Sequence, residues 1–531
     1  MQGNLADTLD LPLAWARAKR DLSQRRAFVC HPFMVDLIEQ DAASWLLVIH
    51  QEIAKGSYSP GPCRTVPAPQ PGFLVRPGAD LSHEDQVIFA ALVAAIRPEL
   101  EEAFFWEGEH PDFAYRLHNE HTDVEWFQHY FPLWERFDAR SIEIIDSGRP
   151  YVVVADIAGY YELIDLFTLR SDLNGLDVDS ETLALLMTCL HRWARVQRRG
   201  VPQGFSASDV LAKLYLNAVD VQLRAEGFVH FRWVDDFRIF CRSESEARRV
   251  LLILPQILGA RELVLQAHKT RILAGEQARA KFQEVHALLD PIHRNFIASL
   301  VELEVIDGPS ITTPVLDDIL AQIQEDEPLE VLTDAYHTYF TLPQPRFNKT
   351  LFRYLLGRLG GARNPFALED AIRQLRIHPE ESDTIAEYAA KVDGTRRFED
   401  AFLELRDEGL LPFDYHLYQV MRWRLRQEGT PTESFLRLAR FAAVEPGGVW
   451  YVKAVGRAVV GRWGGPADLE RRQQVYPDAQ SDQERAEIIC ALHRMERGRR
   501  NAFLGHVAGD GEFSSRAVRA VREGRVRWTV C

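Results

Sequence analysis

The segment FVHFRWVDDFRIFC, Phe228–Cys241, decides the fold that we predict for this chain. Two strand-like runs, Phe228–Val234 and Phe237–Cys241, flank the pair Asp235-Asp236. Because only these two residues separate the runs, they predict a β-hairpin with both carboxylates at its turn. Adjacent carboxylates repel each other, so a nearby cation is the natural compensation. Asp-Gly or Asn-Gly would suit an ordinary acidic turn better, and the pattern therefore favours a functional site.

A further carboxylate, Asp156, ends the apolar run Tyr151–Ala155, which predicts a buried strand. Many strands end in Asp as a helix N-cap, so Asp156 alone is a weak signal. Asp156 lies 79 residues before Asp235, and adjacent strand ends would bring the carboxylates together. We therefore expect a site for two Mg²⁺ ions, with Mn²⁺ as the alternative. One ion would activate a 3′-hydroxyl, and the other would steady a triphosphate and the leaving pyrophosphate.

Two other segments carry candidate site residues. In RRGVPQGFSASDVLAKLYLNAVD, Gln203 and Gly204 form a tight turn before an amphipathic helix that Ser206 would cap. A free glutamine amide in such a turn suits a flat base or sugar, and a plain loop is the alternative. In LVLQAHKTRIL, Lys269 is one of only eight lysines, and an exposed lysine at a strand end is the alternative there.

The chain of 531 residues is long enough for two to four domains, and its two halves differ in pattern. Strand-like and helical segments alternate over residues 45–285, whereas the sequence beyond about residue 290 is almost entirely helical in pattern. Helix breakers such as Gly361, Pro379, Gly394, Pro412 and Gly429 recur there every 15 to 18 residues. Helix pairs would thus repeat at roughly 35 residues, the period of helical solenoids, with a plain helical bundle as the alternative.

Composition narrows the functional classes. The net charge is −15, from 62 basic and 77 acidic residues, which argues against a protein that sheathes a long nucleic-acid duplex. We find no apolar run of membrane-spanning length and no pattern of a signal peptide. The six cysteines form no CxxC pair. We therefore expect a cytoplasmic protein that does not bind membranes.

Taken together, DIAGYY, VPQG, WVDD and HKT resemble, in order and spacing, the motifs of a reverse transcriptase. The resemblance covers about residues 45–285 and implies an α+β fold with right-hand polymerase palm and fingers. It implies catalysis by Asp156, Asp235, Asp236 and Lys269, metal binding by Asp156, the Ile157 carbonyl, Asp235 and Asp236, and substrate contacts from Tyr161, Gln203 and Gly204. In the family, the residue that matches Tyr161 excludes a ribose 2′-hydroxyl, and the lysine that matches Lys269 is proposed to protonate the leaving pyrophosphate. Trp233 departs from the family, which usually has tyrosine there. The fingers segment lacks the lysine often found after its proline, so Arg76 is our candidate triphosphate contact and Arg116 a weaker one, with solvated surface arginines as the alternative.

Finer features, GSYSPG, FAYRL and DDFRIFC, are similar to bacterial antiphage reverse transcriptases, the abortive-infection and defence-associated "unknown group". That resemblance implies fingers and palm over residues 1–285 and an all-α, HEAT-like helical repeat domain over 286–531 that replaces a thumb. It also implies synthesis of DNA from dNTPs in antiviral defence, without a template or from a protein primer in some members, and assembly as a homo-oligomer. Two alternatives stay open: a retron-like or intron-like enzyme that copies a specific RNA, and a non-catalytic scaffold that senses phage.

Overall fold

The computed structural model describes residues 4–23, 28–70, 74–282, 329–341, 347–445 and 447–527. The chain divides into two compact units, each built from separate segments. The first unit comprises residues 1–21, 46–65 and 78–307, and the second comprises residues 22–45, 66–77 and 308–531. The predicted division at residue 285 falls in 283–328, outside the described residues. The two short N-terminal segments that cluster with the second unit were not expected from the sequence.

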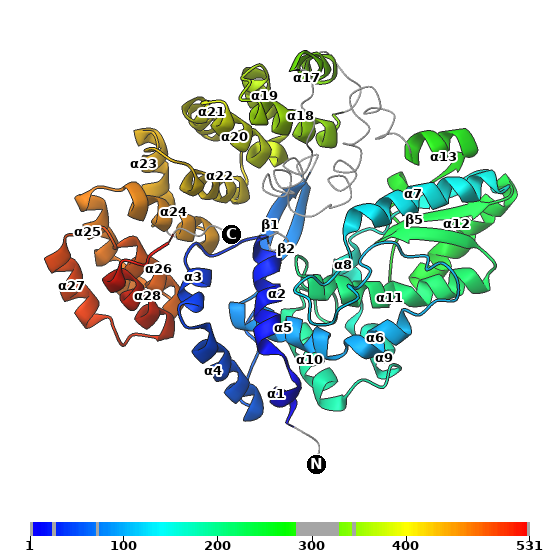
Figure 1. The fold of residues 1–531 in the computed structure, drawn as a ribbon, viewed down its shortest axis with the longest axis horizontal. Coiled ribbons are helices and arrows are strands. Elements are labelled where there is room, and N and C mark those ends of the chain that lie inside the picture. The colour runs from blue at the N-terminus through cyan, green and yellow to red at the C-terminus, as the bar shows by residue number, and fades with distance from the viewer. Residues whose placement is uncertain are drawn as a thin grey trace. The chain divides into compact units, whose positions relative to one another are not determined.

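The first unit surrounds a four-stranded antiparallel sheet of order β4-β5-β3-β6. Its strands are β3 (Tyr151–Ala155), β4 (Val229–Trp233), β5 (Asp236–Cys241) and β6 (Arg271–Ala274). The described helices of this unit are α1 (Leu5–Thr8), α5 (His83–Ala95), α6 (Arg97–Ala103), α7 (Tyr130–Asp146), α8 (Tyr160–Leu163), α9 (Leu166–Asn174), α10 (Ser180–Trp193), α11 (Ser206–Ala225), α12 (Glu244–Gly259), the 3₁₀ turn η2 (Ala267–Lys269) and α13 (Gly275–Phe282). Helices α11 and α12 pack on one side of the sheet, and α7 and α13 pack on the other (Figure 1).

Four further elements cross between the segments of the two units. They are α2 (Leu11–Ser23), α4 (Ala42–Ala54) and the hairpin of β1 (Arg64–Gln70) with β2 (Leu74–Asp80). None of the helices in the described ranges is both long enough and apolar enough to span a membrane.

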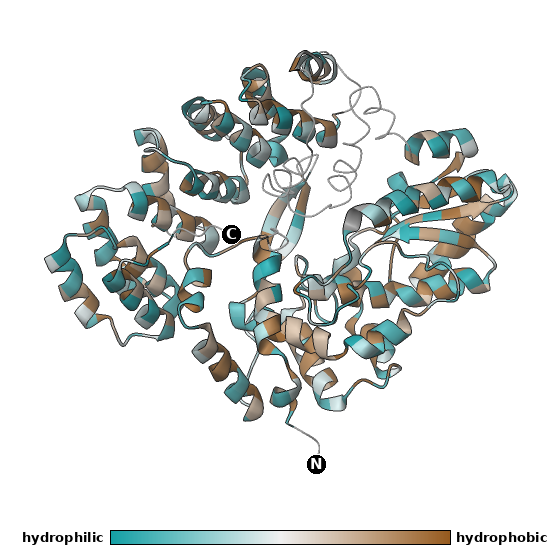
Figure 2. Ribbon diagram, viewed as in Figure 1, coloured by the Kyte–Doolittle hydropathy of each residue, from teal (hydrophilic) through white to brown (hydrophobic). Residues whose placement is uncertain are grey.

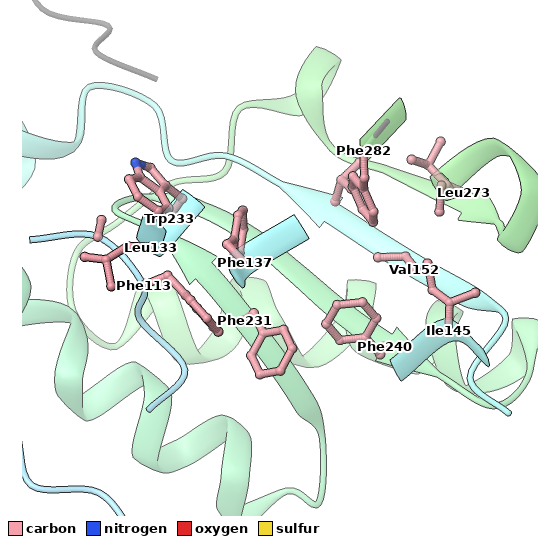
Figure 3. Packing of buried hydrophobic residues seen from close by; sticks show 13 residues of the cluster. Phe113, Leu133, Phe137, Ile145, Val152, Phe231, Trp233, Phe240, Leu273 and Phe282 are labelled. Atoms are coloured by element: carbon pink, nitrogen blue, oxygen red, sulfur yellow. The ribbon is translucent and has the colours of Figure 1, made fainter. Parts of the chain in front are cut away.

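Alternation along the strands explains why the sheet is covered on both sides. Phe231 and Trp233 of β4 and Phe240 of β5 point toward α7 and α13, where they join one buried cluster with Phe137 and Phe282 (Figure 3). The ring centroids of Phe231 and Phe240 are 5.4 Å apart and nearly perpendicular, a favourable aromatic geometry. This packing holds the hairpin flat beneath α7 and fixes the register of its two strands.

The second unit is all helical among its described residues outside the β1–β2 hairpin. Its helices are α3 (Met34–Glu39), α17 (Leu329–Tyr336), the π-helical turn η4 (His337–Thr341), α18 (Lys349–Gly361), α19 (Leu368–Gln374), the 3₁₀ turn η5 (Pro379–Glu381), α20 (Ser382–Lys391), α21 (Thr395–Asp407), α22 (Asp414–Arg426), α23 (Glu433–Ala442), α24 (Trp450–Trp463), α25 (Pro466–Gln474), the 3₁₀ turn η6 (Tyr476–Asp478), α26 (Asp482–Ala491), α27 (Arg497–His506) and α28 (Glu512–Glu523).

Six of these helices, α18, α20, α22, α24, α26 and α28, form a row in which each packs against the next (Figure 1). Successive members begin 30 to 36 residues apart, close to the period expected from the breakers. Members of the row are buried on most sides: every residue from Tyr415 to Leu425 of α22 is buried. The neighbouring odd-numbered helices, by contrast, bury one stripe, as α23 does with Phe435, Leu436, Ala439 and Ala442. In Figure 2 the helices of this unit accordingly carry both teal and brown residues.

Buried arginines tie neighbouring helices of the second unit together. Arg353 of α18 makes two bonds of 2.7 Å to the Glu381 carboxylate before α20. Arg424 of α22 is 2.6 Å from Glu399 of α21, and Arg457 of α24 is 2.8 Å from Glu487 of α26. Each carboxylate is at most 3% exposed. The forked guanidinium suits such pairing because it bonds a carboxylate through two N–H groups at once.

Candidate active site

The hairpin turn differs by one residue from the prediction. Trp233 pairs with Asp236, so the two loop residues are Val234 and Asp235, and Asp236 is the first residue of β5. Val234 has a φ of 54°, which is unfavourable for a β-branched residue. The register of the hairpin sets the offset: Arg232 pairs with Phe237 and Trp233 with Asp236, so Val234 leaves the strand and Asp236 joins β5. Trp233 stays inside the strand, as predicted, where it is 3% exposed and packs 4.9 Å from the Trp134 ring of α7.

The sheet register brings the three predicted carboxylates to one edge. Antiparallel pairing of β3 with β5 places Ala155 opposite Phe237, so Asp156 emerges next to the start of β5. There it meets the turn that carries Asp235 and Asp236. The ammonium group of Lys269 lies 2.8 Å from the Asp156 Oδ2 atom. Four of the residues predicted from separate motifs therefore lie together.

The electrostatics of this edge show excess negative charge. The pKa of the Asp235 carboxyl is raised well above its ordinary value by burial, and also by the charges of Asp236 and Asp156, against the opposing charge of Lys269. In the ranges that the structure describes, no three His, Cys, Asp or Glu side chains are close enough to hold a metal ion by themselves. Carboxylate oxygens are nevertheless the donors that Mg²⁺ prefers, and a divalent cation would relieve the repulsion. The donor set therefore fits Mg²⁺ or Mn²⁺, provided that the side chains close on the ion and Lys269 moves off Asp156.

Backbone pairing after the sheet edge explains the position of Lys269. The Gln266 N–H donates to the Asp156 carbonyl at 2.7 Å, and the Ala158 N–H donates to the Val264 carbonyl at 2.8 Å. These two bonds bracket Ile157, whose own carbonyl is not part of the pairing. The chain then turns through η2 and delivers Lys269 to Asp156. The Ile157 carbonyl takes part in neither of these two bonds, and its role as a metal ligand stays a prediction.

Tyr161 lies at the start of α8, and its hydroxyl donates to the Asp209 Oδ1 atom of α11 at 2.6 Å. Burial, followed by the charge of Asp209, raises the pKa of the Tyr161 hydroxyl well above its ordinary value. The neighbouring Tyr160 is buried and bonds the Ala212 carbonyl of the same helix. No local pattern in the sequence pointed to the bond between Asp209 and Tyr161.

The loop that carries Gln203 and Gly204 is bonded to the segment after Tyr161. Val201 N–H donates to the Tyr161 carbonyl at 3.0 Å, and the Gly200 backbone has a φ of 93°. A Cβ atom at Gly200 would lie 3.4 Å from backbone in α8, an ordinary contact, so it is the positive φ that favours glycine here. Gln203 and Gly204 are half-buried in the turn, and the Gln203 carbonyl accepts from the Ala79 N–H at 3.1 Å.

The helix cap expected from Ser206 is wrong in detail. Phe205 is the N-cap residue of α11 and makes no side-chain cap bond. The Asp21 carboxylate, which is 185 residues away, instead accepts from both the N–H and the hydroxyl of Ser206. A buried carboxylate satisfies the orphan donors and favours the positive end of the helix dipole, so it outcompetes a local serine cap.

The two candidate triphosphate contacts lie outside the four-stranded sheet that carries the carboxylates. Arg76 lies on β2 in a segment of the second unit. Arg116 belongs to the first unit, where its guanidinium lies 5.0 Å above the Phe113 ring and 3.5 Å from the His110 carbonyl. Burial, followed by the charge of Arg136, lowers the pKa of Arg116. The substrate roles of both arginines stay predictions.

A group of buried charges behind the turn was missed by the sequence analysis. We call it the charge cluster, and its members are Asp112, Lys213, Asp220, His230 and Arg232. A charged residue in the apolar run of β4 was the available signal, since strand-interior arginine is seldom buried without partners. Burial opposes the charge of Arg232, but Asp112 and Asp220 outweigh it and raise the pKa of the guanidinium.

Comparisons with known proteins agree with the geometry of the first unit. Residues 100–290 match the family model of the reverse transcriptase (RNA-dependent DNA polymerase). The chain therefore contains a reverse transcriptase domain, which is the domain of a nucleotidyltransferase of the DNA polymerase type. No curated protein matches the sequence.

Two similar solved structures are telomerases. Apo telomerase from Candida tropicalis is 12% identical over 69% of this chain and 70% of that chain, with a TM-score of 0.33. Telomerase from Candida albicans in complex with a fragment of telomeric RNA is 11% identical over 72% of this chain and 71% of that chain, with a TM-score of 0.30. Likeness at this level carries no argument about fold or function.

Proposed function

We propose that this protein is a DNA polymerase of the reverse-transcriptase type that joins dNTPs with two Mg²⁺ ions and acts in antiviral defence. The observation that carries the polymerase chemistry is the meeting of Asp156 with Asp235 and Asp236 at one sheet edge, with Lys269 on Asp156. Those carboxylates and the Ile157 carbonyl would hold two Mg²⁺ ions, which when bound would activate a 3′-hydroxyl and stabilise the leaving pyrophosphate.

Lys269 has two successive roles in this proposal. Without nucleotide, its ammonium neutralises Asp156 across 2.8 Å. The side chain is half exposed, so it can swing away from Asp156 and reach a leaving group. An ammonium beside departing pyrophosphate would supply the proton that the leaving oxygen needs.

We further propose that Tyr161 faces the sugar of the incoming dNTP and that Gln203 and Gly204 contact the base pair. Support comes from the bond between the Val201 N–H and the Tyr161 carbonyl, which ties the loop to α8. The tyrosine ring is held from behind by Asp209, so it would present a fixed edge to the ribose. The 2′-hydroxyl of a ribonucleotide would then clash with the Tyr161 ring, whose position is fixed.

The row of even-numbered helices supports a HEAT-like repeat domain in place of a thumb, because each member packs on the next member of the row and the members recur at a near-constant interval. Similarity of the sequence features to antiphage enzymes supports the defensive role, together with a homo-oligomer and synthesis that needs little or no template. A cytoplasmic location follows from the same proposal.

The test is nucleotide incorporation by the purified chain with Mg²⁺ and each dNTP, with and without added RNA. Asp235→Asn should abolish incorporation, whereas Asp146→Asn should not, because Asp146 is an exposed carboxylate of the same unit paired with Arg279. Product in the absence of RNA favours untemplated synthesis, and a strict need for one co-purifying RNA favours the retron-like alternative. If the wild-type protein makes no DNA under any priming condition, the polymerase proposal fails.

Priming and defence need separate measurements. Nucleic acid covalently attached to the purified protein would identify a protein primer and its residue by mass spectrometry of the linked peptide. Tyr58 is a poor candidate, since its hydroxyl donates to Asp85 at 2.7 Å and burial raises its pKa. For the defensive role, cells that carry wild type or Asp235→Asn are challenged with phage. Equal protection by both proteins would favour the scaffold alternative over an enzyme.

A further inference from the structure

The charge cluster lies directly behind the turn that carries Asp235. Arg232 is the last residue but one of β4 and is 1% exposed. Its Nε and Nη2 atoms fork onto the Asp220 carboxylate of α11 at 2.9 to 3.0 Å. Its Nη1 atom lies 3.0 Å from the Asp112 Oδ2 atom and donates to the Val234 carbonyl at 2.8 Å. One guanidinium therefore joins two buried carboxylates to the first residue of the turn.

The rest of the cluster holds Arg232 in place. Lys213 of α11 donates to Asp112 at 2.6 Å and to the Ala114 carbonyl at 3.1 Å. His230 Nε2 is 3.0 Å from Asp220. Every member is at most 5% exposed. Two acidic and two basic side chains balance, so the cluster is neutral when the histidine is neutral, and no charge is left for a ligand to satisfy.

Backbone hydrogen bonds also hold the end of β4, where Arg232 lies. The Arg232 N–H donates to the Pro111 carbonyl at 2.8 Å, and the Phe113 N–H donates to the Arg232 carbonyl at 3.1 Å. Residues 111–114, which include the start of the FAYRL motif, thus lie beside the end of β4. The start of the FAYRL motif therefore supports the end of β4, although the motif supplies none of the predicted catalytic residues.

The turn needs such support. Val234 has a φ of 54°, a conformation that β-branched residues avoid and that persists only where the surroundings over-determine it. The peptide that follows leads directly into Asp235. A hydrogen bond to the Val234 carbonyl therefore fixes the plane from which the Asp235 side chain departs.

We propose that Arg232, held by Asp220 and Asp112, is a positioning residue that fixes the Val234–Asp235 peptide and so orients the Asp235 carboxylate before a metal ion binds. This inference rests on the proposed function as far as the metal is concerned. The positioning of the turn, however, is independent of any activity and is measured separately below.

The decisive variant is Arg232→Lys, because a single ammonium keeps the charge but cannot reach two carboxylates and a carbonyl in a fork. Arg353→Lys is the matched control, since Arg353 is also a buried, forked arginine, in the second unit. Deuterium exchange of the full-length apo protein should become about tenfold faster at residues 233–237 in Arg232→Lys and stay unchanged there in Arg353→Lys. Binding of Mn²⁺ alone, followed by the loss of its free EPR signal, should weaken about tenfold in the first variant only.

Rescue separates positioning from simple destabilisation. Adding Val234→Gly to Arg232→Lys removes the penalty of positive φ, so Mn²⁺ affinity should recover in part, whereas the melting temperature should stay well below that of wild type because the charge cluster remains broken. If Arg232→Lys does not fold, Asp220→Asn serves with the same readouts, because it weakens the fork without changing its volume.

The proposal is overturned if the folded Arg232 variant exchanges and binds Mn²⁺ like wild type, or if Arg353→Lys changes both to the same extent. If wild type binds no Mn²⁺, the proposed function fails, and exchange at residues 233–237 still decides whether Arg232 holds the turn.

Discussion

Buried carboxylates in the helical unit each face an arginine, whereas the carboxylates at the sheet edge face one another. Glu381, Glu399 and Glu487 lie 2.6 to 2.8 Å from guanidinium nitrogens. Asp235 and Asp236 instead share an edge with Asp156, which is paired with the half-exposed Lys269. Buried charges that serve the fold are paired within the protein. The carboxylates at the sheet edge instead carry excess negative charge, which a bound ligand is to balance.

The largest effect on activity should come from replacing a carboxylate at the sheet edge. Asp235→Asn keeps the shape of the side chain and removes a metal-binding oxygen charge, so incorporation of dNTPs should fall by roughly 10³-fold or more. Primer extension or untemplated labelling measures this loss, with Asp146→Asn as the control. Retention of a tenth of the wild-type rate would contradict the role of Asp235.

The largest effect on stability should come from breaking a buried ion pair of the helical unit. Glu399→Gln leaves Arg424 buried with a weakened partner, and loss of one partner of a buried pair costs about 3–5 kcal/mol at the upper limit. Urea unfolding followed by circular dichroism measures the change. The rate of incorporation per folded molecule should be unchanged, and a loss of rate in parallel with stability would erase the contrast between the two regions.

The pH dependence of stability should have opposite signs in the two regions. The raised pKa of Asp235 means that its ionisation destabilises the folded state. Wild type should therefore lose stability relative to Asp235→Asn as pH rises above about 4, the ordinary value of the unfolded carboxyl, through the folded pKa.

The contribution of Glu487 to stability should depend on pH in the opposite direction, increasing as pH rises. Burial would raise its pKa, but His31 and Arg457 outweigh burial and lower it. Its contribution, measured against Glu487→Gln, should be full above about pH 4.3 and be lost as pH falls through the lowered folded value. Free energies of unfolding from pH 3 to pH 8 give both curves, and slopes of the same sign would refute the distinction.

The smallest effect should come from Lys269. Lys269→Met removes the ammonium that competes for Asp156, so Mn²⁺ should bind the apo protein a few times more tightly, while incorporation slows by about 10²-fold through loss of the proton donor. Isothermal titration and single-turnover kinetics measure the two quantities. Metal affinity that falls together with rate would instead make Lys269 a structural residue.

What could be predicted from sequence is what local patterns encode. Strand ends at Asp156 and at the hairpin gave the meeting of carboxylates, and the spacing of breakers gave the interval between helices of the row. What could not be predicted depends on contacts between distant segments. Asp21 caps α11 from 185 residues away, and Asp112 reaches Lys213 from 101 residues away. The turn itself moved by one residue, since the cross-strand register that pairs Trp233 with Asp236 is not encoded in the local apolar pattern.

The pairing of α3 with α28 has a consequence for the order of synthesis. Arg516 of α28 donates to the carbonyls of Leu37, Ile38 and Asp41, and the first of these contacts joins residues 479 positions apart. At about 5–20 residues per second, a ribosome needs roughly half a minute to a minute and a half to make that stretch. Throughout this time α3, with its apolar residues Met34, Leu37 and Ile38, lacks α28 as a packing partner. During synthesis, α3 must therefore be kept from misfolding or aggregation until α28 has been made.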